Sequence, residues 1–146
     1  MISDRDYMRK GPGRRGGSSM GSYAMPTLVA FNIFIALLDW ISSNGAKLGP
    51  MGQMFDLFPN LVIYKFQIWR LFTYMFFHAN LTHILFNMWG LYLFGTILER
   101  RIGSNMFFAL YFVCGLGGGL LWLVFNFSSN NYCLGASAAV MGIMIG

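Results

Sequence analysis

The stretch LTHILFNMWGLYLFGTIL, residues 81–98, decides the fold. It is apolar over almost its whole length and is close to the about 20 residues that a helix needs to cross the ~30 Å hydrocarbon core of a bilayer. His83 and Asn87 interrupt it four residues apart, so on a helix both side chains lie on one face. Polar side chains inside a span are costly, face the protein interior and mark functional sites. The stretch therefore predicts a membrane span that carries a functional pair.

The composition predicts the same class of protein for the rest of the chain. Of its 146 residues 56% are hydrophobic and only 10% are charged, whereas a soluble domain has roughly 25% charged residues. Length allows one domain. The predicted fold class is an all-α, multi-pass membrane protein.

Three further segments complete the predicted bundle, and a basic tail orients it. The spans are expected at 24–41, 81–98 and 106–127, and a fourth helix at 135–146. Residues 1–23 are glycine-rich and contain five of the ten basic residues, namely Arg5, Arg9, Lys10, Arg14 and Arg15. By the positive-inside rule this tail is cytoplasmic, and the net charge of +5 is a topology signal rather than a nucleic-acid surface.

Residues 42–80 are predicted to form an outer loop that lies partly in the membrane interface. The part 61–77 is apolar enough to resemble a span, but Lys65 and Arg70 would then lie near mid-membrane, at about 2.5–3.5 kcal/mol each. A span there would also place Arg100 and Arg101 on the outer side, against the positive-inside rule.

The last segment predicts a helix that begins near Ser137 among the small residues Gly135, Ala136 and Ala138. A helix start offers free backbone N–H groups and a positive dipole end, which suit a nucleophile whose attack creates an oxyanion. Topology places this start at the depth of His83 and Asn87. From Leu134 on, the helix would cover only about 20 Å, so we expect the chain to be part of a longer protein.

Each of these signals also has a purely structural interpretation. Small residues around a serine usually serve helix packing, as does the glycine-rich run 115–119 with its G-x-x-x-G spacing. A single intramembrane histidine or asparagine more often bonds a neighbouring helix than reacts. Cys114 and Cys133 have no metal-binding or redox spacing, and nothing supports a disulfide between them.

Taken together, four motifs in order resemble the rhomboid family of intramembrane serine proteases. They are Trp69-Arg70 in the outer loop, HANLTHILFN at 78–87, ERRIGS at 99–104 and Gly135-Ala-Ser137. The resemblance covers about residues 24–146. It implies a six-helix core that hydrolyses transmembrane segments of other proteins, without a metal or organic cofactor, and that has the bilayer and such substrates as its partners.

The resemblance also implies a role for each matching residue. Ser137 would be the nucleophile, and His83 and Asn87 would donate to the oxyanion together with the Ser137 backbone N–H. The structural positions would be Trp69, Arg70, Glu99, Arg101 and Gly135. His78 would serve local hydrogen bonding.

Two departures from the family pattern limit this expectation. Ala138 replaces the usual glycine after the serine, and its methyl group could crowd the oxyanion site. The family's general base is a histidine on the sixth helix, and the only histidines here are His78 and His83. The 146 residues alone should therefore be inactive, with the base supplied by a longer parent protein.

Two other function classes stay open at this stage. A non-enzymatic rhomboid-like protein that binds or routes membrane proteins would fit Ala138 and the missing base. A channel or transporter would need polar residues along a whole path, whereas here they cluster at one depth. Substrate and oligomeric state remain open, and the bacterial cytoplasmic membrane is only a default location.

Overall fold

A computed structural model of the chain describes residues 21–43 and 50–146, and every regular element in these ranges is a helix. The predicted basic tail, 1–23, lies almost wholly outside the described residues. Three helices are long and apolar enough to cross a membrane: α1 (Ala24–Ser42), α5 (Leu81–Ile102) and α6 (Ser104–Phe125). A fourth helix, α7 (Ser137–Ile145), follows them. The predicted all-helical membrane fold class is confirmed.

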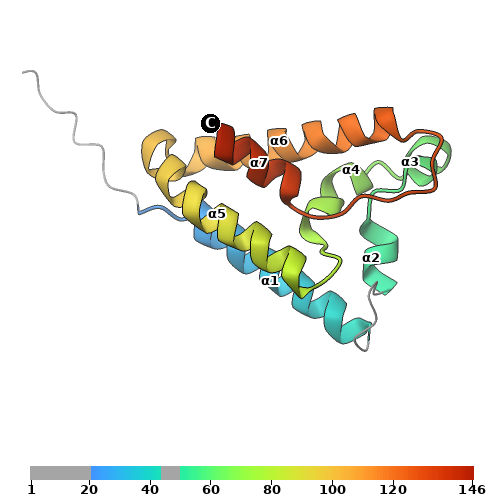
Figure 1. Cartoon of the computed structure of the whole chain (residues 1–146), viewed down its shortest axis with the longest axis horizontal. Coiled ribbons are helices and arrows are strands. Elements are labelled where there is room, and N and C mark those ends of the chain that lie inside the picture. The colour runs from blue at the N-terminus through green and yellow to red at the C-terminus, as the bar shows by residue number, and fades with distance from the viewer. Residues whose placement is uncertain (1–20, 44–49) are drawn as a thin grey trace, which may run out of the picture.

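The helices form a wedge whose open end is filled by short elements (Figure 1). α1 lies beside α5, and α7 packs along α6, its most extensive partner. The α1–α5 pair and α6 meet near the α5–α6 turn and separate toward the opposite end. There the chain places α2 (Pro50–Phe55), α3 (Pro59–Lys65), α4 (Arg70–Thr73) and the 3₁₀ turn η1 (Tyr74–Phe76).

The region 61–77 is divided between short helices, so it is not a single long helix. α3 ends at Lys65, and the next residue, Phe66, adopts a left-handed conformation with φ 53°. This conformation is unfavourable for a residue with a Cβ and stops the helix. The three candidate spans found among the described residues do not include this region.

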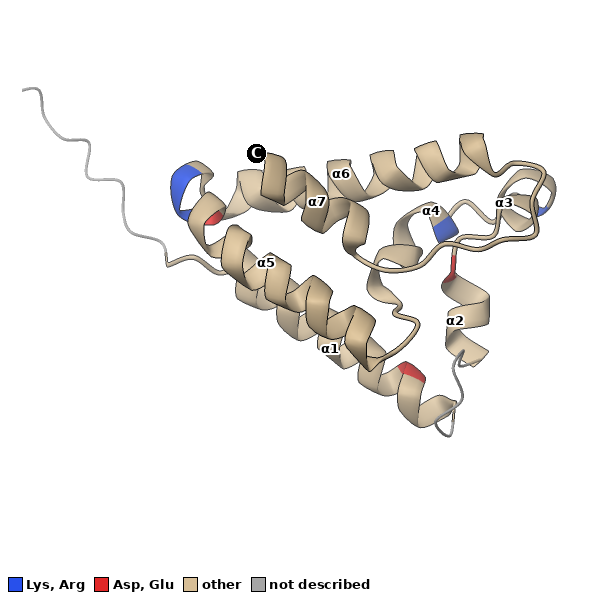
Figure 2. Cartoon of the chain, viewed as in Figure 1, with Lys and Arg blue, Asp and Glu red and all other residues tan. Residues whose placement is uncertain are grey.

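Apolar and charged side chains are distributed over the described residues as in a membrane protein. Large apolar side chains face outward on all three spans, for example Phe34, Trp89 and Val113, which are more than half exposed. Charged residues gather at the helix ends and in the short elements (Figure 2). Asn32, by contrast, is buried and donates hydrogen bonds to the Leu28 carbonyl (2.8 Å) and the Tyr111 hydroxyl (3.3 Å).

The glycine-rich run of α6 packs against two different partners. A methyl group built on Gly115 would collide with Met75, and one on Gly119 would lie 2.9 Å from the Tyr74 ring. Both neighbours belong to η1. Gly118 instead faces Ala138 of α7. The glycine-rich run therefore packs against both the helix α7 and the loop element η1, because successive glycines point in different directions around α6.

Candidate active site

The start of α5 is fixed by the side chain of Asn80. Asn80 is extended, with φ −167°, and its side-chain oxygen accepts a hydrogen bond from the His83 backbone N–H at 2.8 Å. This satisfies one of the N–H groups that every helix start leaves free. The cap sets the first turn of α5 and therefore the directions of His83 and Asn87.

The segment that leads into α7 is held by the loop that precedes α5. Leu57 and Cys133 exchange two backbone hydrogen bonds of 3.0 Å, and the Gly135 N–H donates to the Tyr74 carbonyl at 2.9 Å. Asn60 donates to Asn130 at 2.9 Å. The position of the α7 start therefore depends on residues 57–74.

Ser137 is the first residue of α7, where the sequence predicts a helix to begin. It is exposed. Ala136 precedes it as the N-cap and provides no side-chain hydrogen bond. The first intrahelical bond of this turn runs from the Val140 N–H to the Ala136 carbonyl at 2.9 Å. The N–H groups of Ser137 and the next residues thus have no intrahelical acceptor and are available to an anion.

The side chains of His83 and Asn87 on α5 approach Gly135, two residues before Ser137. A methyl group built on Gly135 would lie 2.6 Å from His83 Cε1, 2.7 Å from His83 Nε2 and 3.6 Å from Asn87 Nδ2. Gly135 also has φ +109°, which disfavours any residue with a Cβ. The structure therefore brings His83, Asn87 and the start of α7 together, and this close approach requires glycine.

Asn87 is one of several described residues with a buried polar atom that lacks a hydrogen-bond partner. Its side chain is buried, and among the described residues its Nδ2 amide has no acceptor. Buried donors are nearly always paired, and an exception calls for a functional explanation. The orphan donor lies beside Gly135, near the exposed serine.

The two histidines of the chain are in contact with each other. The rings of His78 and His83 pack edge to face, with centroids 5.2 Å apart. Burial lowers the pKa of His78 to about 4, and the nearby His83 acts in the same direction. His78 is therefore neutral at pH 7. Neither ring nitrogen of His78 has a hydrogen-bond partner among the described residues.

The methyl group of Ala138 packs against α6. It faces Gly118 of α6, where an added methyl group would collide with it. The extra carbon that distinguishes Ala138 from the family's usual glycine is therefore accommodated between α6 and α7. One turn on, the pattern is reversed, with Gly142 against Cys114.

Comparison with known proteins identifies the family. The family described as Rhomboid domain matches residues 65–146, more than half of the chain. RHOMBOID-like protein 1 of Arabidopsis thaliana is 37% identical over 101 residues, which cover 66% of this chain and 25% of that protein. The chain belongs to the rhomboid family.

Some of its rhomboid relatives are proteases by name and others are not. Rhomboid protease GluP of Bacillus subtilis (strain 168) is 28% identical over 130 residues, 89% of this chain and 24% of that protein. RHOMBOID-like protein 6, mitochondrial, of Arabidopsis thaliana is 25% identical over 168 residues, 94% of this chain and 54% of that protein. The chain thus spans about a quarter to a half of the length of these relatives.

In this rhomboid chain, Trp69 and Arg70 have different environments. Trp69 is 48% exposed, whereas Arg70 is buried. Arg70 donates to the carbonyls of Asp56 (2.6 Å) and Gln53 (3.1 Å) and, through Nε, to the side chain of Gln67 (2.7 Å). Arg70 therefore ties α4 to the end of α2, next to the residue that pairs with Cys133.

The other motif, Glu99 and Arg101, is equally asymmetric. Glu99 is buried and accepts hydrogen bonds from the backbone N–H groups of Ala24 (2.7 Å) and Met25 (3.0 Å) and from the Ser104 hydroxyl. It thus caps α1 from α5. Arg101 is exposed, and no hydrogen bond or ion pair joins it to a described residue.

Two residues near the site, Tyr74 and Asp56, have no feature in the sequence that marks them. Tyr74 is buried, its hydroxyl donates to the Gly115 carbonyl at 2.6 Å, and its own carbonyl accepts from Gly135. Asp56 is fully buried, and neither carboxyl oxygen has a hydrogen-bond partner among the described residues. Burial raises the pKa of Asp56 to about 7, the nearby Asp39 acts in the same direction, and Arg70 opposes the shift.

Within 21–43 and 50–146, no group of three or more His, Cys, Asp or Glu residues could hold a metal ion.

Proposed function

We propose that this rhomboid chain is part of an intramembrane serine endopeptidase that hydrolyses transmembrane segments of other membrane proteins. The observation that carries the proposal is the meeting of His83 and Asn87 at Gly135, two residues before an exposed serine at a helix start. The names of relatives such as Rhomboid protease GluP support the same activity.

The chemistry assigns one role to each group. Ser137 Oγ attacks the carbonyl carbon of the scissile peptide and passes its proton to a general base. The carbonyl oxygen becomes an oxyanion, to which Asn87 Nδ2–H, His83 Nε2–H and the Ser137 backbone N–H donate. The C–N bond then breaks, the amine takes the proton from the base, and water hydrolyses the remaining ester on Ser137.

The general base would come from outside these 146 residues. His83 is assigned as an oxyanion donor, and the ring of His78 packs against His83. A histidine that activates a serine must lie within hydrogen-bond reach of its hydroxyl. Ser137 is exposed, which leaves room for such a residue to approach.

The orientation in the membrane follows from the same proposal. The basic residues among the first fifteen would be cytoplasmic, together with Arg100 and Arg101. The starts of α5 and α7 would then lie near the outer surface. Substrates would be membrane proteins whose transmembrane helices unwind near that surface.

A fluorophosphonate probe tests the proposal without knowledge of the substrate. The natural protein that carries this sequence is purified in mild detergent and treated with the probe. We expect covalent labelling that Ser137→Ala abolishes and Ser128→Ala, at an exposed loop serine, leaves unchanged. Labelling that does not depend on Ser137 would contradict the proposal and would favour a non-enzymatic rhomboid that binds or routes membrane proteins.

A further inference from the structure

Asp56 is a fully buried acid that the proposed catalysis does not use. It follows directly after α2 and precedes Leu57 in the loop. Its side chain is not exposed at all, and neither carboxyl oxygen has a hydrogen-bond partner among the described residues. A buried polar group without a partner costs free energy, so its presence at this position calls for an explanation.

The carboxyl group of Asp39, near the end of α1, faces the same small space as that of Asp56. Gly52 of α2 lies between them. A methyl group built on Gly52 would lie 3.5 Å and 3.7 Å from the two Asp56 carboxyl oxygens and 3.7 Å from Asp39 Oδ2. Asp39 Oδ1 accepts a hydrogen bond from the Gly52 N–H at 3.0 Å. An ionised Asp56 would place a second carboxylate in this space, and like charges at close range repel each other.

Two further groups face Asp56, one from α4 and one from the segment before α7. They are the guanidinium group of Arg70 and the thiol of Cys133. Arg70 donates its hydrogen bonds to the carbonyls of Gln53 and Asp56 and to the side chain of Gln67, so they do not reach the Asp56 carboxyl oxygens. Burial raises the pKa of Cys133 to about 11, which keeps the thiol neutral at pH 7. The charge of this cluster therefore depends on the proton of Asp56.

The carboxyl group of Asp56 gains and loses its proton near neutral pH. Burial, and to a smaller extent Asp39, raise its pKa to about 7, while Arg70 opposes the shift. Asp56 is therefore mostly neutral at about pH 6 and mostly ionised at about pH 8.5. A rise in pH across neutrality adds a negative charge to a buried space that already holds one carboxylate.

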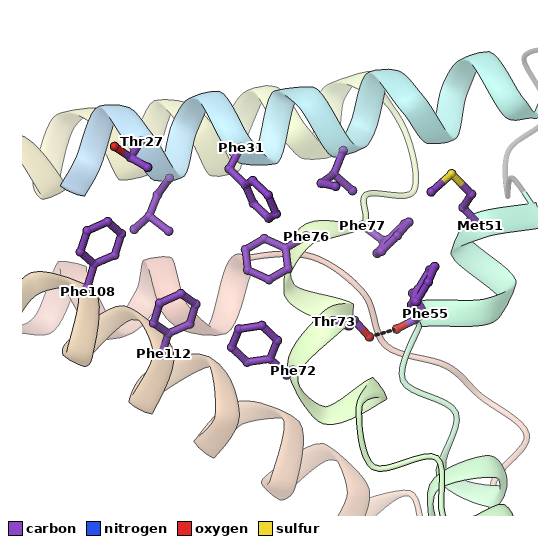
Figure 3. A pocket seen from close by; sticks show the side chains of 12 residues that line it. Thr27, Phe31, Met51, Phe55, Phe72, Thr73, Phe76, Phe77, Phe108 and Phe112 are labelled. Carbon is purple, nitrogen blue, oxygen red and sulfur yellow. Dashed lines mark hydrogen bonds between the residues drawn. The ribbon is translucent and has the colours of Figure 1, made fainter. Parts of the chain in front are cut away.

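Asp56 lies between two contacts that connect α2 to the rest of the fold. On one side, the carbonyl of Phe55 accepts a hydrogen bond from the Thr73 hydroxyl of α4 at 2.8 Å (Figure 3). On the other side, Leu57 exchanges two backbone hydrogen bonds of 3.0 Å with Cys133. The second contact holds the segment that leads into α7. A displacement of Asp56 would therefore act on this segment through the adjacent Leu57.

We propose that Asp56 is a positioning residue for Ser137. Its neutral carboxyl group keeps the Leu57–Cys133 pairing intact, and its ionised carboxylate releases that pairing. Repulsion from Asp39 and the gain of hydration draw the ionised group out of its buried position, and Leu57 moves with it. This role rests on the proposed function of Ser137 as the nucleophile, whose reaction should slow as pH rises through neutrality.

A pH profile of fluorophosphonate labelling tests this role. The rate of labelling at Ser137 is measured from about pH 6 to about pH 8.5 in the natural protein and in Asp56→Asn, which mimics the neutral carboxyl group at every pH. The ratio of the two rates cancels the titration of the general base, because both proteins share it. We expect the ratio of natural protein to Asp56→Asn to fall several-fold over this range. A constant ratio would overturn the proposal.

Two further variants separate positioning from a general loss of stability. Tyr111→Phe removes a buried hydroxyl that accepts a hydrogen bond from Asn32 but keeps Asp56, so the ratio of natural protein to this variant should not change with pH. A ratio that falls as steeply as that to Asp56→Asn would overturn the proposal. If Asp56→Asn fails to fold, Asp39→Asn takes its place, because it removes the second carboxylate. The ratio to Asp39→Asn should also fall with pH, and a constant ratio would overturn the proposal.

Deuterium exchange tests the loop pairing independently of activity. Peptides that cover residues 55–58 and 132–136 are compared between the natural protein and Asp56→Asn at equal pH, so the intrinsic exchange rate cancels and local opening remains. We expect exchange to be several-fold faster in the natural protein at about pH 8.5 and equal in the two proteins at about pH 6. Equal exchange at both pH values would overturn the proposal. If Ser137 is not labelled at any pH, the proposed function fails, and exchange alone decides whether Asp56 controls the pairing.

Discussion

The two ends of α5 each bury a polar side chain, but in opposite hydrogen-bonding states. At the end of the helix, Glu99 accepts bonds from two backbone N–H groups of α1 and from Ser104. Near the start, Asn87 is also buried, and its amide has no acceptor among the described residues. A satisfied buried group stabilises the fold, whereas an unsatisfied one costs free energy. The difference separates a structural position from a candidate catalytic one.

The largest expected effect follows a change at Gly135, where the two polar groups of the site converge. Gly135→Ala would place a methyl group 2.6 Å from His83 Cε1 in a backbone conformation with φ +109°. We expect fluorophosphonate labelling of Ser137 to fall by more than about 10²-fold, the scale of a lost oxyanion donor. Gly117→Ala, which meets nothing within 4 Å, is the control and should keep its labelling. Normal labelling of Gly135→Ala would show that His83 does not need this close contact.

A substitution of Glu99, whose carboxylate is fully hydrogen-bonded at the end of α5, should lower the stability of the fold. Glu99→Ala leaves the Ala24 and Met25 N–H groups without their acceptor, at a cost on the order of 3 kcal/mol. Unfolding in a denaturing detergent series measures this cost. Arg101→Ala, at the exposed partner of the same motif, should change stability by less than about 0.5 kcal/mol. Equal effects of the two substitutions would contradict the cap assigned to Glu99.

The α6–α7 contact should show a smaller, reciprocal effect. Gly118→Ala adds a methyl group where Ala138 already lies, so we expect a loss of about 1–3 kcal/mol. In the double variant Gly118→Ala/Ala138→Gly the two methyl groups no longer collide, and most of this loss should be recovered. Additive effects in this double-mutant cycle would mean that the two positions do not compete for space.

A pH dependence of stability should originate at Asp56. This carboxyl group faces Asp39, Arg70 and the thiol of Cys133, and its pKa is raised to about 7 in the folded protein from 3.8. Between these values the folded state binds more protons than the unfolded state, so stability falls as pH rises from about 4 to 7 and is level above. The slope is at most about 1.4 kcal/mol per pH unit. Asp56→Asn should remove it, and an unchanged slope would assign the dependence to another group.

Residues close in sequence were predictable, because helical periodicity and capping are local. The apolar runs predict three spans, and the small residues around Ser137 predict the start of α7. The four-residue spacing of His83 and Asn87 predicts that they share a face. These expectations needed no knowledge of how the helices pack.

Contacts between distant segments could not be predicted in this way. The Leu57–Cys133 pairing and the two hydrogen bonds of Tyr74 depend on the path of an irregular loop. Gly118 and Ala138 meet only because α7 packs along α6, and α6 is apolar on every side, so its pattern does not mark a buried face. Because the sequence does not predict these contacts, it suggests instead that the methyl group of Ala138 crowds the oxyanion site.

The central claim is that Asn87 is an unpaired donor reserved for an oxyanion, and one measurement tests it most directly. The rate of Ser137-dependent fluorophosphonate labelling is compared between the natural protein, Asn87→Ala and Asn131→Ala, a control at an exposed loop amide. The account predicts that Asn87→Ala slows labelling, with about 10²–10³-fold as the upper guide, at unchanged stability, while Asn131→Ala labels normally. An unchanged rate in Asn87→Ala would contradict it and return the residue to helix packing.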